Sequence, residues 1–209
     1  MIVTLDGRKL EQLTTFRGTL EALVARARAG LSDEQIIVAV TINGRELVGE
    51  ELNRQLSAEV SNDVQVDLEC AAAREIAASA LREAADRLEL AAEAMSEVAT
   101  DFQSGRFTAA TGGLTSLLSV WNTCQQTLGQ AGTLLHRDLT HELHDGETLI
   151  VLLGKVAETL RSLRDAVEAR DNVLIADLLE YEMPGLCQRW NRILQHLADE
   201  VQRTATAAA

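Results

Sequence analysis

The stretch at residues 81–102, LREAADRLELAAEAMSEVATDF, decides the fold of the larger part of this chain. Its apolar residues recur at alternating steps of three and four, which is the spacing of one buried stripe on an α-helix. The charged residues between them fall on the other side of the helix and face water. Residues 149–167 repeat the pattern. This near-heptad spacing favours helices that pack at a shallow angle, so it predicts an antiparallel bundle.

The sequence after residue 70 predicts four such helices, at 71–103, 107–135, 147–170 and 173–201. Pro184 lies inside the fourth helix, where a proline removes one backbone hydrogen bond, so we expect a kink near Glu180–Pro184. We therefore place a four-helix bundle at 71–203, followed by a disordered tail at 204–209.

Residues 1–70 have a different pattern and predict a small α+β domain of three to five strands with one main helix. Apolar or alternating runs at 2–5, 36–42 and 64–68 predict strands, and we expect the run at 36–42 to be covered on both faces. Asn43-Gly44 is a strong hairpin signal. Thr14 or Thr15 is expected to cap the helix that ends at Gly30. The whole chain is predicted to be α+β, mainly α.

Composition limits the classes of function. The formal charge of −13 opposes binding to a phosphate backbone, so we expect no nucleic-acid partner. No apolar run approaches the roughly 20 residues that span a bilayer, and the N-terminus lacks the pattern of a signal peptide, so we expect no membrane association. The cysteines Cys70, Cys124 and Cys187 lie far apart in the sequence, as unpaired thiols of a reducing compartment do. These features predict a cytoplasmic protein.

The segment 136–147, HRDLTHELHDGE, holds three of the four histidines. His136, Asp138, His141 and His144 are candidate metal ligands, because imidazole and carboxylate groups three residues apart on a helix can meet on one side of a divalent ion. The spacing from His141 to His144 is one residue short of the His-Glu-x-x-His zinc motif. The segment therefore supports two interpretations, a polar loop between helices or the centre of a metal- or small-ligand-binding enzyme or sensor.

Other chemical motifs are absent from the sequence. The glycines at 105, 112 and 113 lack the lysine and the preceding strand of a phosphate-binding loop. The carboxylates of the segment 177–182 need not share one helix face and have no nucleophile near them in the sequence. The sequence therefore predicts no catalytic residues and no cofactor.

Several short motifs resemble those of a family of uncharacterised bacterial proteins that join a small α+β N-terminal part to a helical domain. The matching motifs are Asn43-Gly44-Arg45-Glu46-Leu47, Glu51-Leu52, the segment 102–107 and the segment 177–182. The resemblance implies this fold for most of the chain and implies no activity. The helical part is also similar in architecture to flagellar export chaperones, which are small acidic bundles that mask an apolar helix of a secreted subunit.

The sequence favours a non-enzymatic, chaperone-like or adaptor-like protein that binds another protein, with an amphipathic helix as the expected ligand. A homo-oligomer is compatible with the same features. We place the partner-binding face at the kinked end of the last helix, at Tyr181, Met183 and Trp190, because these residue types anchor apolar side chains of a partner. The other interpretation makes Met183 and Trp190 ordinary core residues.

Overall fold

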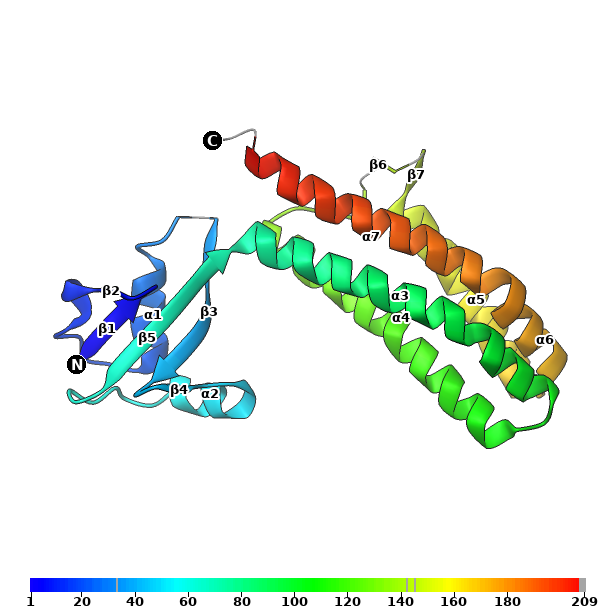
Figure 1. Cartoon of the computed structure of the whole chain (residues 1–209), viewed down its shortest axis with the longest axis horizontal. Helices are drawn as coiled ribbons and strands as arrows, with labels where there is room; N and C mark the ends of the chain where they lie inside the picture. The colour runs from blue at the N-terminus through cyan, green and yellow to red at the C-terminus, as the bar shows by residue number, and fades with distance from the viewer. Residues whose placement is uncertain (33, 142, 145, 207–209) are drawn as a thin grey trace. The chain divides into compact units, whose positions relative to one another are not determined.

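The computed structural model describes residues 1–32, 34–141, 143–144 and 146–206. It divides into two compact units, Met1–Ile76 and Ala77–Ala209. A five-stranded sheet lies in the first unit and long helices form the second (Figure 1). The predicted class, α+β and mainly α, is confirmed. The first unit ends at Ile76 instead of residue 70, because its last strand continues to Ala72.

The sheet of the first unit has the strand order β2-β1-β5-β3-β4. Its strands are β1 (Ile2–Leu5), β2 (Arg8–Lys9), β3 (Gln35–Ile42), β4 (Arg45–Glu46) and β5 (Gln65–Ala72). β1 and β5 are parallel, with Val3 opposite Val66, and the other neighbours are antiparallel. The turn between β3 and β4 is the predicted hairpin, in which Asn43 and Gly44 adopt positive φ angles of 51° and 80°.

Helix α1 (Leu20–Arg28) supplies the main helical contribution to the core of the first unit. Its N-cap is Thr19, whose hydroxyl accepts a hydrogen bond from the Ala22 N–H at 3.3 Å. The prediction of Thr14 or Thr15 as the cap is wrong, because Thr14 follows the short 3₁₀ helix η1 (Glu11–Leu13) and its hydroxyl donates to the Glu11 carbonyl. A short helix α2 (Gly49–Leu56) lies between β4 and β5 in the sequence.

Strand β3 is incompletely covered, and only one of its eight residues is buried. Val40 is buried against the core, whereas Val38 is 46% exposed. A register shift between Ile37 and Ala39 interrupts the pairing of β3 with β5 at this point. The prediction that this strand is covered on both faces is therefore wrong. Its continuous apolar run belongs to an irregular strand that is partly exposed to solvent, and not to a fully buried one.

Four helical segments form the second unit, as predicted. They are α3 (Ala73–Gln103), α4 (Phe107–Leu135), α5 (Leu149–Ala169), and a composite of α6 (Asn172–Asp177), η2 (Leu178–Glu182) and α7 (Met183–Thr206). Figure 1 shows α4 returning along α3 and α7 returning along α5, so that these neighbours are antiparallel. α7 continues to Thr206, beyond the expected start of the tail at 204, and residues 207–209 lie outside the described part of the chain.

One continuous apolar core holds these helices together. At its centre, the rings of Trp121 and Trp190 meet edge to face, with centroids 5.8 Å apart and planes at 88°. The thiol of Cys124 contacts the Ala84 carbonyl, and the Asn191 amide donates to the Ala85 carbonyl at 2.8 Å, so α3 packs against both α4 and α7.

The composite helix departs from α geometry just before Pro184. In the π-helical segment η2, the Met183 N–H donates to the Leu178 carbonyl five residues earlier. A proline cannot donate to the carbonyl four residues before it, and its ring clashes with that carbonyl. The wide turn relieves this conflict in the region where we predicted a kink.

Candidate functional site

The predicted metal cluster lies in the connection between α4 and α5, which is not helical. His136 ends α4 with a positive φ of 51°. His144 lies in the short strand β6 (Leu143–His144), which pairs with β7 (Glu147–Thr148), a hairpin that the sequence did not predict. The side chains of His144 and Glu147 are not described, and Glu142 and Asp145 lie outside the described residues. The expectation of ligands at helical spacing is therefore wrong for this segment.

Asp138 and His141 are the two candidate ligands that the structure brings together. The His141 Nδ1 atom lies 2.8 Å from one Asp138 oxygen. The other oxygen accepts hydrogen bonds from the Thr140 hydroxyl at 2.6 Å and the Thr140 N–H at 2.9 Å. Among the described residues, no group of three His, Cys, Asp or Glu side chains is placed to hold a metal ion.

The hydrogen bonds around Asp138 determine its chemistry. The Thr140 hydroxyl, then the Thr140 N–H and then His141, lower the pKa of the Asp138 carboxyl to about 2. A carboxylate with so low a pKa stays ionised and is a weak general base. The arrangement therefore stabilises a turn and offers little for acid–base catalysis.

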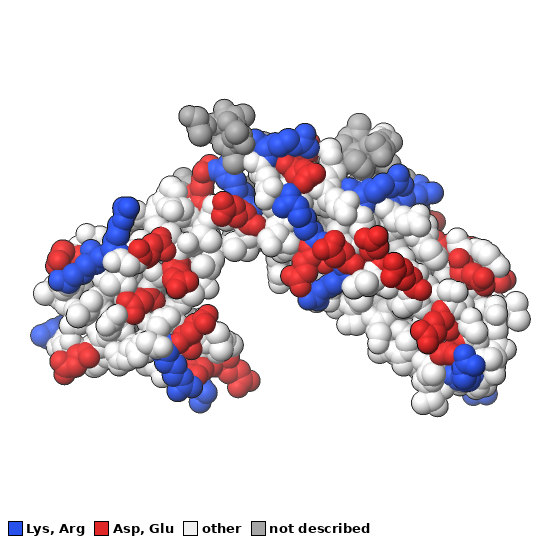
Figure 2. Space-filling model, viewed as in Figure 1, with Lys and Arg blue, Asp and Glu red and all other residues white. Residues whose placement is uncertain are grey.

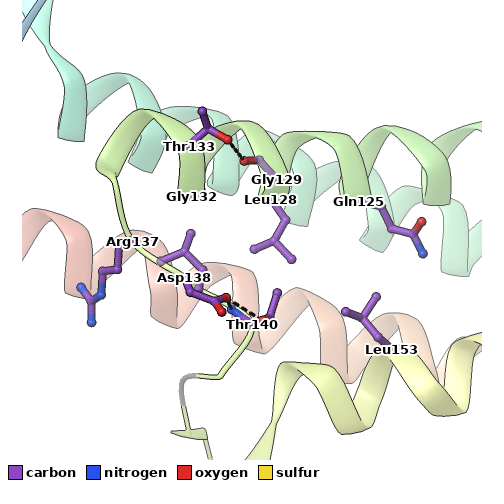
Figure 3. A pocket seen from close by; sticks show the side chains of 10 residues that line it. Gln125, Leu128, Gly129, Gly132, Thr133, Arg137, Asp138, Thr140 and Leu153 are labelled. Carbon is purple, nitrogen blue, oxygen red and sulfur yellow. Dashed lines mark hydrogen bonds between the residues drawn. The ribbon is translucent and has the colours of Figure 1, made fainter.

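A cavity of about 480 Å³ lies beside this turn (Figure 3). Leu128 of α4, Leu139 and Leu153 of α5 supply its apolar walls. Asp138 and Thr140 at its edge bond to each other, and Arg137 points away from the other labelled side chains (Figure 3). The Asp138 carboxylate and the Thr140 hydroxyl thus bond within the turn that borders the cavity.

The predicted partner-binding face at the end of the last helix is only partly exposed. Tyr181 is 71% exposed, but Met183 and Trp190 are 1% and 0% exposed. Placing Met183 and Trp190 on a surface is wrong, because they belong to a buried stripe that recurs at steps of four and three along α7. That stripe comprises Met183, Cys187, Trp190, Leu194, Leu197 and Val201.

A groove between α3 and α4 is a mostly apolar opening on the second unit. Its volume is about 540 Å³. It contains Leu90, which is 66% exposed although it is a large apolar side chain. The other lining residues are Arg87, Ala91, Ala94, Glu97, Val98 and Asp101 from α3, and Ala109, Gly113, Ser116, Leu117 and Val120 from α4.

Small residues bring the two helices together at the bottom of the groove. A Cβ atom on Gly113 would lie 2.5 Å from a methyl carbon of Val98, so a larger residue there would force Val98 to shift. Asp101, at one end of the groove, is almost buried and accepts a hydrogen bond from the Arg106 Nε at 2.8 Å. The groove therefore has a fixed floor and little uncompensated charge at this end.

Helix α4 differs from its neighbours in charge. None of its 29 residues is Asp, Glu, Lys, Arg or His. Figure 2 shows charged side chains gathered over α3 and α7, whereas the flank along which α4 runs is mostly white. The groove was not predicted from the sequence, although two signals were available: Leu90 falls outside the buried stripe of α3, and α4 contains no charge.

No helix in the described part of the chain is long and apolar enough to cross a membrane.

Comparison with known proteins identifies the family. Residues 79–193 match a family described as a domain of unknown function (DUF8042), and this match spans the groove and the core of the second unit. An uncharacterised protein of Treponema pallidum (strain Nichols) is 27% identical over 205 residues, which cover 97% of this chain and all of that protein. No solved structure matches the chain.

These matches confirm the resemblance to an uncharacterised bacterial family. Neither description names a chaperone, so the likeness to flagellar export chaperones stays a prediction. The family match covers more than half of the 209 residues, and the chain therefore belongs to the DUF8042 family.

Proposed function

We propose that this chain is a non-enzymatic adaptor-like protein whose α3–α4 groove binds an amphipathic helix of a protein partner. The observation that carries the proposal is Leu90, an exposed leucine in an apolar groove between two helices. Grooves of this kind bind helices through apolar side chains spaced three, four and seven residues apart.

The dimensions of the groove suit a short helix. Its lining runs along α3 from Arg87 to Asp101, a rise of about 21 Å at 1.5 Å per residue. That length accommodates about four turns of a bound helix. Ala91, Ala94 and Gly113 project little from their helices, so a partner helix can approach closely and cover Leu90.

Charge favours a partner with basic residues beside its apolar stripe. Asp86 and Glu93 lie within four residues of Leu90 on α3, and Glu97 lines the groove itself. Arg87 is already paired with Glu83 at 2.6 Å. A chain with a net charge of −13 attracts such a helix over a distance and repels an acidic one.

The cytoplasm is the compartment that we propose for this activity. Burial raises the pKa of the Cys124 thiol to about 11. Burial and the nearby Cys124 thiol together raise the pKa of the Cys187 thiol to about 12. Both thiols are therefore protonated core residues, as expected in a reducing compartment.

Two substitutions in the groove test the proposal against a matched control. Leu90→Arg and Ala94→Arg each place a large charge where the partner would dock, whereas Glu158→Arg changes an exposed site on α5. We expect both groove variants to lose a protein that co-purifies with the wild-type chain from its native source, and the control to retain it. Equal retention by all three variants would contradict the proposal.

Metal analysis separates this proposal from the metal-dependent alternative. One metal ion per chain, in protein purified without an affinity tag and lost on His141→Ala, would favour an enzyme or sensor built on the 136–147 segment. Metal content unchanged by that substitution would leave the adaptor proposal in place.

A further inference from the structure

Eight of the exposed residues on the outward side of α4 lie at strict heptad spacing. The steps between them are four, three, four, three, four, three and four. They are Thr108, Gly112, Thr115, Ser119, Asn122, Gln126, Gly129 and Thr133, called here the α4 seam. The seam points away from the core and shares no residue with the lining of the α3–α4 groove.

The outer residues of the α4 seam are the same read in either direction, and its four inner residues are all uncharged and polar. A two-fold axis between Val120 and Trp121 pairs the outer residues as Thr108 with Thr133 and Gly112 with Gly129. It pairs the inner residues as Thr115 with Gln126 and Ser119 with Asn122. In antiparallel packing of two heptad-spaced helices, such pairs lie in the same layer. The seam is thus complementary to an antiparallel copy of itself, as a two-fold interface requires.

The two glycines of the α4 seam have no function within the chain that the structure shows. A Cβ atom on Gly112 or Gly129 would meet nothing within 4 Å. A glycine inside a helix lowers helix stability relative to alanine. The close approach of the backbone of another molecule to this face of α4 accounts for glycine at both positions.

The hydroxyl groups of the α4 seam can be covered without leaving donors unpaired. Thr115 donates to the Thr111 carbonyl at 2.8 Å, and Thr133 donates to the Gly129 carbonyl at 2.9 Å. The side chains of Asn122 and Gln126 have no hydrogen-bond partner among the described residues. Under the two-fold axis, their amides face Ser119 and Thr115 of the second copy, which supplies partners for both.

Charge determines which partner this face fits. Two copies of a chain with net charge −13 repel each other wherever acidic surfaces meet. The 29 residues of α4 carry no charge, so contact through them avoids that repulsion. A contact along the seam is about 38 Å long and about 10 Å wide, which buries roughly 760 Å² in total, below the roughly 1,000 Å² of a stable interface and in the range of a weak one.

From these observations we infer that α4 packs antiparallel against α4 of a second copy, forming a weak dimer through the α4 seam. This inference goes beyond the proposed function, because the groove on the other side of α4 stays open in the dimer.

Sedimentation equilibrium of the full chain tests the dimer. We expect the mass to rise with concentration from 22.7 kDa towards twice that value. Ser119→Glu places two carboxylates beside each other at the two-fold axis and should raise the dissociation constant by at least about tenfold. Adding Asn122→Arg to Ser119→Glu should restore the dimer. Ser96→Glu, at an exposed site on α3, is the matched control.

Circular dichroism verifies that each variant keeps its helical fold. A chain that stays at 22.7 kDa up to its solubility limit would overturn the inference. A dimer weakened equally by Ser119→Glu and Ser96→Glu would exclude the α4 seam as its interface. A dimer lost in Ser119→Glu and not regained in the double variant would overturn the antiparallel register. None of these results affects partner capture by the groove, which is measured separately.

Discussion

Helices α3 and α4 are nearly equal in length, 31 and 29 residues, but α3 carries ten charged residues and α4 carries none. Both bury a stripe in the same core, so the difference lies in their other faces. A helix face in contact with water normally carries charge. Charge is depleted where protein surfaces are covered by other proteins. The comparison therefore supports the proposal that the uncharged surface of α4 contacts protein.

The largest expected effect tests whether both helices share one core. Leu88→Ala in α3 and Leu117→Ala in α4 should each lower the free energy of unfolding by about 2–5 kcal/mol, because each leaves a cavity in the packed interior. Chemical denaturation measures this loss. Glu89→Ala, an exposed control on α3, should change the free energy by about 0.5 kcal/mol or less. A loss at Leu117 as small as the control would show that α4 does not belong to the core.

Two adjacent glycines distinguish the inner face of α4 from its outer face. Gly113→Ala forces a Cβ atom against the stiff side chain of Val98 and should lower the free energy of unfolding by about 1–3 kcal/mol. Gly112→Ala enters open space and should raise it by about 0.5–1 kcal/mol, since alanine favours the helix. Thermal denaturation in dilute solution measures both changes. If both substitutions changed the free energy of unfolding in the same direction, the inner and outer faces of α4 would not differ as described.

The helical unit could be predicted from its sequence because its period is regular. The observed bounds of α4 are the predicted ones, and those of α3 and α5 differ by one or two residues. Leu160, which falls on the apolar repeat of residues 149–167, is only half-buried, because it lies at the edge of the stripe that Val156 and Leu163 define.

The sites could not be predicted, because they depend on the rotation of each helix about its axis. Residue type alone suggested that Met183 and Trp190 are exposed anchors, and the helical phase of α7 buries both. Strand β5 runs four residues past its predicted end, to Ala72, because pairing with Gln35–Ile37 extends it. Such pairing between distant segments leaves no local signal in the sequence.

The smallest expected effect is on the pKa of Asp138, in the charged segment that follows α4. The hydrogen bonds from Thr140 contribute most to the low pKa of Asp138. Thr140→Val should therefore raise that pKa from about 2 towards its ordinary value, and His141→Ala should raise it less. NMR titration of the carboxyl carbon measures both shifts. A larger shift in His141→Ala would contradict this order of causes.

The same pKa predicts the direction of a pH effect on stability. The folded-state pKa of Asp138 is lower than its unfolded value, so the stabilisation is present above about pH 4 and is lost as the pH falls towards 2. Asp138→Asn should remove this part of the pH dependence, since asparagine does not titrate.

A photo-crosslinking amino acid at Leu90 tests the central claim, that the α3–α4 flank binds protein, most directly. The same amino acid at Glu158 on α5 controls for random contacts at an exposed helical site. In cells of the native source, we expect discrete adducts from position 90 that disappear when Ala94→Arg is added, and none of these adducts from position 158. Identical adduct patterns at positions 90 and 158 would contradict the account.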